Sequence, residues 1–237
     1  MFPIGDDNSD RTITPVVNYL FIGINILVFV LLQQIGSNDS FSYAFSLVPR
    51  EITSGVDLTG LIDIKSASGK IIGQIPHYET PLGVYFNFLS SMFMHGDIMH
   101  ILGNMLFLWV FGDNLENMLG HLRYAAFYIV CGFAAAAAQI VMDTDSIIPM
   151  LGASGAISGV LGGYLLLFPT RRVRALIFSF LTEVPAFVAL GLWIGFQIVQ
   201  GYFASAETGG VAYAAHIGGF VAGVILVKIF AIGTQKT

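Results

Sequence analysis

Six long apolar segments constrain this chain more than any other feature, because each is about long enough to cross the roughly 30 Å hydrocarbon core of a bilayer. Of the 237 residues, 55% are hydrophobic and 11% are charged, whereas a soluble domain is nearer one quarter charged. The sequence therefore predicts an all-α membrane protein with six transmembrane helices, built as a single domain over residues 1–237. We expect helices near residues 15–33, 98–115, 122–141, 152–168, 184–203 and 211–230.

The positions of the lysine and arginine residues predict how the six segments are oriented. With a cytoplasmic N-terminus, seven of the ten cations fall on the inner side and three fall in the loop of residues 35–82 on the outer side. This bias follows the positive-inside rule and predicts that both termini are cytoplasmic. The inner cations are Arg11, Arg123, Arg171, Arg172, Arg174, Lys228 and Lys236, and the outer ones are Arg50, Lys65 and Lys70.

Two connecting segments carry predictions of their own. The first outer loop, residues 35–82, is too long for a simple connection. Its runs 61–65 and 70–73 flank a Ser-Ala-Ser-Gly turn and predict a small hairpin. Aromatic residues follow the loop, so we expect it to be folded and partly embedded at the outer face. Residues 175–181 are expected to lead into the fifth helix, either at the interface or as an extension of that helix, with Pro185 in its first turn.

One serine and one histidine lie inside apolar segments, where an unpaired polar group is costly. Ser154 belongs to the Gly-Ala-Ser-Gly motif of residues 152–155, which by itself indicates close helix packing. His216 is more informative, because ionisable residues in membrane segments are rare and usually face a polar interior. Gly219 and Gly223 share the face of His216, so this face can approach another glycine-lined helix closely. Together the serine and the histidine would form a nucleophile and its base.

A second polar cluster, His95, His100 and Asn104, lies at the start of the second segment. His100 and Asn104 are four residues apart and share a helix face. The metal-site interpretation fails, because there is no His-Glu-x-x-His pair and because His95 and His100 point roughly 140° apart on a helix. In the expected topology His100, Asn104, Ser154 and His216 lie within roughly 10 Å of one depth on the outer side. Packing residues would scatter through the membrane, so this common depth indicates a site.

The chemistry of these side chains predicts a Ser–His dyad. Ser154 would attack a carbonyl carbon, and neutral His216 would take its proton and later protonate the leaving amine. No carboxylate is available near His216 in the sequence to complete a triad. Asn104, His100 and the backbone N–H of Ser154 can donate to the oxyanion. The residues indicate no cofactor, no metal and no nucleic-acid partner, and they assign no oligomeric state.

Three motifs, in this order and on this topology, together resemble the rhomboid family of intramembrane serine proteases. The resemblance implies a six-helix membrane endopeptidase that cuts transmembrane substrates near their outer ends, within the lipid bilayer. We expect a prokaryotic plasma membrane. Gly112-x3-Glu116 also looks like a structural turn of the family. The three motifs are His95-x4-His100-x3-Asn104, Gly152-Ala-Ser154-Gly155 and Ala215-His216-x2-Gly219-x3-Gly223.

The resemblance also implies roles for single residues. Trp193 and Phe196 of the fifth helix would belong to a side gate for the substrate. Some rhomboids carry an aromatic residue four positions after the nucleophile that stacks on the histidine; here that position is Ser158, so the stack is absent or comes from elsewhere. The Trp-Arg pair found in the first loop of some members is missing. The implied site comprises Ser154 as nucleophile, His216 as base, His100, Asn104 and Gly152 at the oxyanion hole, and His95 in support.

Two other function classes compete with a protease. A transporter would place polar groups throughout the depth of the membrane and would usually repeat one half of its fold, and the sequence has neither feature. An inactive rhomboid-like protein that binds membrane helices without cutting them stays open, because a dyad can be present and misaligned.

Overall fold

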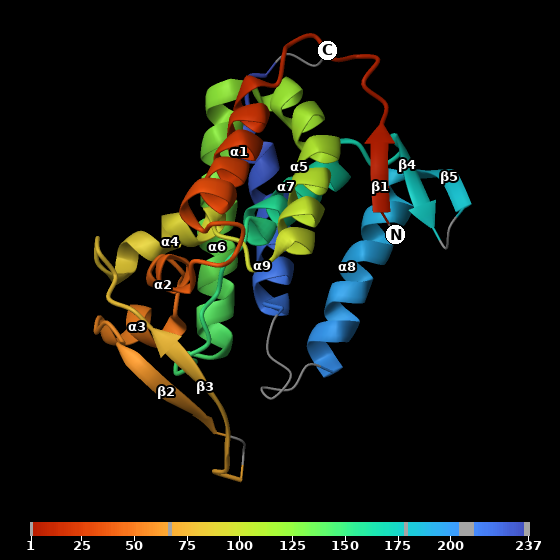
Figure 1. Ribbon diagram of the computed structural model, residues 1–237. Coiled ribbons are helices and arrows are strands. Elements are labelled where there is room, and N and C mark those ends of the chain that lie inside the picture. Colours follow the sequence, from red (N-terminus) through yellow and green to blue (C-terminus); the bar gives the residue numbers. More distant parts are fainter. Residues whose placement is uncertain (1, 66–67, 178–179, 204–210, 235–237) are drawn as a thin grey trace.

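The computed structural model describes residues 2–65, 68–177, 180–203 and 211–234, so that Lys236 lies outside the described residues. The fold is mostly helical (Figure 1). Among the described residues, four helices are long and apolar enough to cross a membrane, and two shorter apolar helical stretches occupy the other two expected segments. The four are α5 Ile98–Leu119, α6 His121–Met142, α8 Ala186–Phe203 and α9 Tyr213–Phe230; the shorter ones are Val16–Leu32 and α7 Ser154–Leu167.

Helices α7 and α9 pack backbone against backbone at the centre of the bundle (Figure 1). A Cβ atom on Gly223 would lie 2.0 Å from the carbonyl oxygen of Gly159, and one on Gly219 would lie 2.2 Å from that of Gly155. No side chain fits between these surfaces, so glycine alone permits this approach. Since α5, α7 and α9 all begin at the same end of the bundle, their first turns lie close together.

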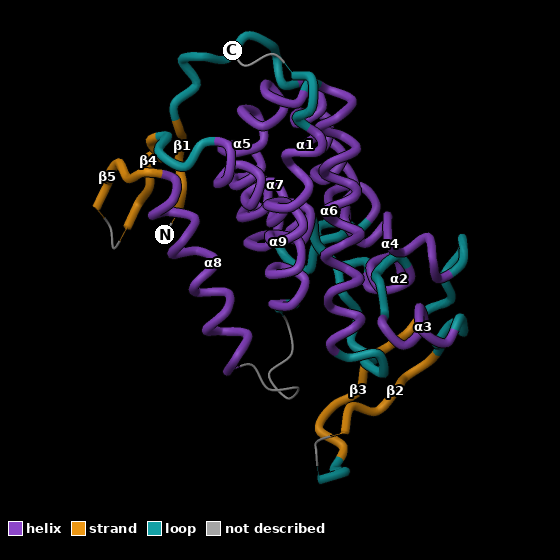
Figure 2. The backbone as a smooth tube through the Cα atoms, turned by 180° about the vertical axis from the view of Figure 1, so that it is seen from behind, coloured by secondary structure: helices purple, strands orange, loops and turns teal. Residues whose placement is uncertain are grey.

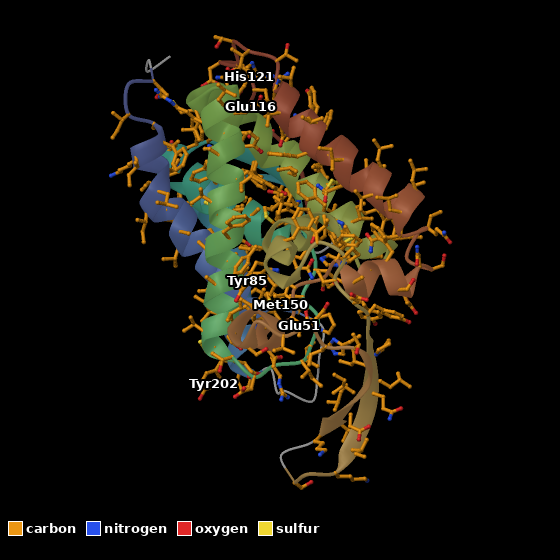
Figure 3. The ribbon with its side chains drawn as sticks, turned by 90° about the vertical axis from the view of Figure 1, so that its left-hand side faces the viewer. Glu51, Tyr85, Glu116, His121, Met150 and Tyr202 are labelled. Carbon is orange, nitrogen blue, oxygen red and sulfur yellow. The ribbon has the colours of Figure 1, made fainter. Side chains whose placement is uncertain are left out.

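The opposite end of the bundle is held by side chains of α5 and by the N-terminal segment. The carboxylate of Glu116 accepts hydrogen bonds from the backbone N–H groups of Val17 at 3.0 Å and Asn18 at 2.7 Å, and so caps α1, Val16–Leu27. The side chains of Glu116 and His121 also meet at 2.5 Å (Figure 3). Helix α5 itself continues to Leu119, past the expected end at residue 115. The expected turn at Gly112 and Glu116 is wrong, because both lie inside α5.

The loop of residues 35–82 contains the predicted hairpin. Strand β2, Gly60–Lys65, pairs antiparallel with β3, Ile71–His77, with Ile62 opposite Ile75. The hairpin projects away from the bundle at the end where α5, α7 and α9 begin (Figure 2). Short helices α2, Asp39–Ala44, and α3, Pro49–Ser54, precede it, and α4, Asn87–Ser90, follows it.

A second sheet was not predicted. Strands β1, Phe2–Asp6, β4, Arg172–Ile177, and β5, Phe180–Pro185, form an antiparallel sheet in the order β1-β4-β5 (Figure 1). The expected helical extension at residues 175–181 is wrong for the described part of that segment, which is strand. Its place at the membrane interface stays a prediction. Pro185 ends β5 instead of beginning the helix, at a strand end where its missing N–H costs little. The N-terminal strand pairs with residues that lie 167 to 174 positions away in the sequence, which local patterns cannot reveal.

The side chain of Asp6 attaches this sheet to the bundle. It accepts hydrogen bonds from the hydroxyl of Tyr164 at 2.5 Å and from the amide of Asn114 at 2.7 Å. Burial raises the pKa of Asp6 from 3.8 to about 7, with the negative charge of Asp113 adding to the effect, although the two hydrogen bonds and Arg171 oppose it. Asp6 therefore keeps a proton in the folded protein at pH values where the unfolded chain has released it.

We expect Asp6→Asn to flatten the pH dependence of stability. In the parent, protonated Asp6 stabilises the fold fully below about pH 4, and this contribution is lost as the pH rises to about 7. The parent should therefore lose about 2 to 3 kcal/mol more than the variant between pH 5 and 8. Unfolding midpoints in detergent over this range measure the difference. Glu51, whose pKa burial also raises to about 7, titrates in both proteins and cancels. Parallel curves would contradict the expectation.

Candidate active site

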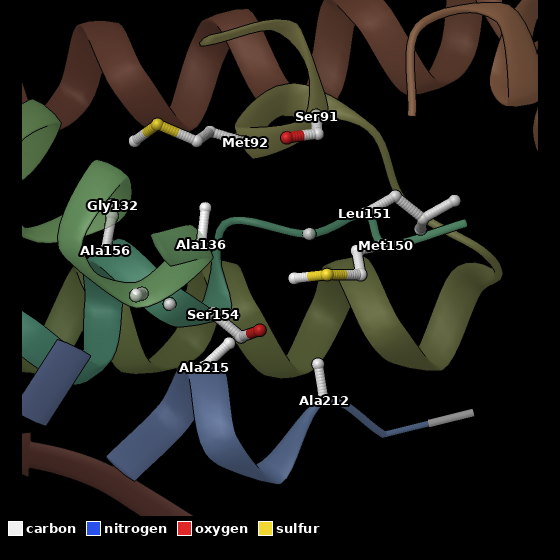
Figure 4. Close-up of a pocket in the computed structure, with 13 residues that line it drawn as sticks. Ser91, Met92, Gly132, Ala136, Met150, Leu151, Ser154, Ala156, Ala212 and Ala215 are labelled. Atoms are coloured by element: carbon white, nitrogen blue, oxygen red, sulfur yellow. The ribbon is translucent and has the colours of Figure 1, made fainter. Parts of the chain in front are cut away.

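Ser154 and His216, predicted to meet, are in hydrogen-bond contact. Ser154 is the first residue of α7, and His216 lies in the first turn of α9. The hydroxyl oxygen of Ser154 is 2.8 Å from Nε2 of His216. The close glycine contacts between α7 and α9 allow the first turns of the two helices to approach to this distance. Figure 4 shows Ser154 beside Ala215 of α9, with Met150 and Ala212 nearby.

The loop before α7 fixes the direction of Ser154. Gly152 has a φ of +129°, which residues other than glycine rarely adopt. Its backbone N–H donates to the carbonyl of Ser91 at 2.9 Å. Leu47 and Met150 exchange two backbone hydrogen bonds of 2.9 and 2.7 Å, which join this loop to the first loop. The turn at Gly152 therefore leads directly into the first residue of α7, where the backbone N–H groups of a helix start are unpaired.

His100 lies directly over this turn. A Cβ atom on Gly152 would be 2.8 Å from Nε2 of His100, so a larger residue would displace the imidazole. Asp97 caps the start of α5 by accepting the N–H of His100 at 2.8 Å, which places His100 in the first turn. His100, Gly152 and Ser154 thus come together at the starts of two helices, as the sequence predicted.

Asn104 and His95 form a buried pair behind His100. The amide nitrogen of Asn104 lies 2.9 Å from Nε2 of His95, and His95 is fully buried. Gln33 holds the backbone of His95 from both sides, with two bonds of 2.9 Å to its N–H and its carbonyl. An amide nitrogen has two hydrogens, so Asn104 can bond His95 with one and donate the other into the site. His95 therefore supports Asn104 and is not exposed to a substrate.

Sequence reasoning missed a third group on the histidine. The side-chain oxygen of Gln197, in α8, lies 2.8 Å from Nδ1 of His216. The oxygen of a side-chain amide can accept a hydrogen bond from a histidine N–H just as a carboxylate can. Sequence reasoning considered only carboxylates for this position and so passed over Gln197. Ser158, at the position of the aromatic residue of some relatives, donates to the carbonyl of Ser154 at 2.6 Å instead. Aromatic contact comes from Trp193 and Tyr213, whose ring centres lie 6.2 and 6.5 Å from that of His216.

A cleft of about 1090 Å³ leads to Ser154 and His216. The starts of α5 and α9, the helix α8 and the first loop line this cleft. Trp193 also lies in the cleft, with its ring centre 6.3 Å from that of Phe107 in α5. Phe196, the other expected gate residue, is 59% exposed. Trp193 therefore links α8 to α5 through this ring contact, and the gate role of both residues stays a prediction.

The fold and the site together define an integral membrane protein with a serine–histidine pair in a cleft at one end of a helical bundle. The family model of the Rhomboid domain matches residues 82–232, a range that includes Ser154, His216 and Gln197. The chain therefore belongs to the rhomboid family.

Curated relatives agree with this assignment. The chain is 34% identical to the mitochondrial Rhomboid protein 1 of Saccharomyces cerevisiae over 58% of its length, and 30% identical to Rhomboid-related protein 2 of Mus musculus over 59%. It is 26% identical to Rhomboid protease GluP of Bacillus subtilis over 88% of its length. The matches cover 39%, 46% and 34% of these relatives, respectively, so the chain spans less than half of each.

Proposed function

We propose that this protein is an intramembrane serine endopeptidase that cleaves transmembrane helices near the outer membrane face. The observation that carries the proposal is the 2.8 Å contact between the Ser154 hydroxyl and Nε2 of His216, in a cleft of a rhomboid-family protein. A nucleophile and its base must lie within hydrogen-bond reach of each other, and this pair does so.

The reaction follows from the contact. The Ser154 oxygen bonds to the carbonyl carbon of the scissile peptide while its proton passes to Nε2 of His216. The tetrahedral intermediate collapses when the C–N bond breaks, and His216 protonates the departing amine. Water from the cleft then attacks the acyl-enzyme, with His216 again taking the proton, and Ser154 is restored as the free acid product leaves.

Three donors of the site are proposed to hold the negative oxygen of the intermediate. They are the backbone N–H of Ser154 at the helix start, the free amide hydrogen of Asn104 and the ring of His100 over Gly152. The carbonyl oxygen develops its charge only in the intermediate, so donors fixed in advance stabilise the transition state more than the substrate. His95 contributes by orienting Asn104.

The proposed topology has six membrane spans in one domain, with both termini in the cytoplasm and the cleft opening to the outer face. The contacts of three predicted inner cations support it, since Arg11, Arg123 and Arg171 bond to Asp113, Ile232 and Asp10 at the end opposite the cleft. The partners are then transmembrane protein substrates and the surrounding lipid. The relatives come from a bacterium, a fungus, a plant and an animal, so the prokaryotic plasma membrane stays a prediction.

Labelling with a fluorescent fluorophosphonate tests the proposal, because this reagent modifies a serine only when a base activates it. We expect labelling of the parent protein and none of Ser154→Ala. Ser54→Ala, a matched change at an exposed serine of α3, should label like the parent. The same three proteins should show the same order in cleavage of a model transmembrane substrate.

A folded parent protein with no Ser154-dependent labelling and no cleavage would overturn the proposal. It would leave the inactive alternative, which predicts that a photo-crosslinkable transmembrane peptide is still captured in the cleft. If the parent and Ser154→Ala capture this peptide with equal efficiency and the parent is not labelled, the protein is the inactive, helix-binding kind.

A further inference from the structure

We propose that Gln197 is the positioning residue of the site, and that it makes a Ser–His–Gln arrangement out of the expected dyad. Its side-chain oxygen lies 2.8 Å from Nδ1 of His216, on the side of the ring opposite Ser154. The inference rests on the proposed protease function and adds a third residue to it.

The hydrogen bond selects one of the two neutral forms of the imidazole. An amide oxygen only accepts, so Nδ1 of His216 must carry the ring hydrogen. Nε2 then holds a lone pair that faces the hydroxyl of Ser154, which is the form a general base needs. In the other form Nε2 would carry the hydrogen and could not accept the proton of the serine. Gln197 thus favours the productive form before substrate arrives.

An amide suits this position better than a carboxylate would. The side chain of Gln197 is almost completely buried, at 9% exposure, on a helix that we place in the membrane. A buried carboxylate there would carry a large desolvation cost, whereas an amide supplies the acceptor without a charge. Cysteine proteases with a Cys–His–Asn site use an amide in the same role.

The position of Gln197 on α8 explains why the sequence did not suggest it. Trp193 lies one turn earlier on the same face, with its ring 6.2 Å from that of His216, so two successive turns of α8 hold the imidazole. Helix α8 stands beside the bundle and meets it mainly along α9 (Figure 1). The orientation of His216 therefore depends on how α8 docks.

The titratable groups that line the cleft with His216 are Asp97, His100, Asp143, Tyr43 and Tyr213.

Kinetics of the full chain in lipid vesicles with a fluorogenic transmembrane substrate test the role. We expect Gln197→Met, which keeps the length of the side chain and removes the acceptor, to lower kcat by about 10- to 100-fold, the cost of one hydrogen bond to a charged ring. KM should change less than about twofold, because Gln197 acts through His216 and not on the substrate. The matched control is Ile198→Met, which changes the next residue of α8. The side chain of Ile198 is exposed on the surface that we place toward lipid, so this variant should keep the parent kcat.

Two further readouts separate positioning from simple packing. Gln197→Glu can accept the same bond, so it should recover kcat relative to Gln197→Met at high pH. Its carboxylate favours a charged His216, so the acid limb of kcat should move to higher pH. Nitrogen NMR of labelled histidine, assigned with His216→Ala, should show hydrogen on Nδ1 in the parent and a mixture of both forms in Gln197→Met. The NMR result does not require turnover.

The outcomes distinguish this inference from the proposed function. If Ser154-dependent labelling is present but Gln197→Met keeps kcat within twofold of the parent, the positioning role is wrong and the protease stands. An unchanged ratio of imidazole forms in a folded Gln197→Met protein also overturns it. If the parent itself shows no Ser154-dependent labelling, the protease proposal fails, and the NMR ratio alone decides whether Gln197 orients His216.

Discussion

Replacing His216 with alanine is expected to lower kcat for cleavage of a transmembrane substrate by at least about 10⁴-fold. The serine hydroxyl at 2.8 Å then has no base to take its proton, and the leaving amine has no acid. The double variant Ser154→Ala/His216→Ala should be no slower than either single variant, because residues that act as one unit do not contribute additively. Initial rates in vesicles, with the unfolding midpoint measured alongside, provide the test.

The control for this prediction is a histidine at the other end of the bundle. His121 contacts Glu116 at 2.5 Å, far from the cleft (Figure 3). His121→Ala should keep the parent kcat even if the midpoint of unfolding falls slightly. Substantial turnover by a folded His216→Ala protein would show that another group is the base. Additive losses in the double variant would show that serine and histidine act separately.

The second large effect concerns stability. Gly223→Ala is expected to lower the free energy of unfolding by about 3 kcal/mol or more, because the added carbon would lie 2.0 Å from the carbonyl oxygen and 2.8 Å from the Cα of Gly159. These are backbone atoms, which cannot rotate away, so α7 and α9 must separate. Since Ser154 and His216 sit on these two helices, Ser154-dependent labelling should fall together with the unfolding midpoint.

Gly195→Ala in α8 is the matched control. Apart from its chain neighbours and the nearby backbone of α8 itself, no atom of the described residues lies within 4 Å of a Cβ built there. Alanine also favours a helix over glycine by up to about 1 kcal/mol. Gly195→Ala should therefore unfold at or above the parent midpoint. If Gly223→Ala were as stable as Gly195→Ala, the close packing of α7 on α9 would be wrong.

Much of the fold was predictable from local patterns. Apolar runs located the helices to within a few residues, and alternation around a turn located the β2–β3 hairpin. The sheet of β1, β4 and β5 was not predictable, because its pairing joins residues 2–6 to residues 173–176. The local sequence of either strand does not indicate which segment it pairs with. The role of Glu116 was hidden for the same reason, since the helix start that it caps is nearly 100 residues away.

The sequence by itself determined which residues could carry the chemistry. A serine and a histidine in apolar segments, at one depth and beside glycine-lined faces, were expected to meet, and they lie 2.8 Å apart. Only the tertiary structure decided what holds the histidine. The rotation and docking of α8 turn Gln197 and Trp193 toward His216, and helix docking is set by packing among distant residues. Depth along a helix follows from counting residues, whereas the direction in which a side chain faces its neighbours follows from the packed bundle.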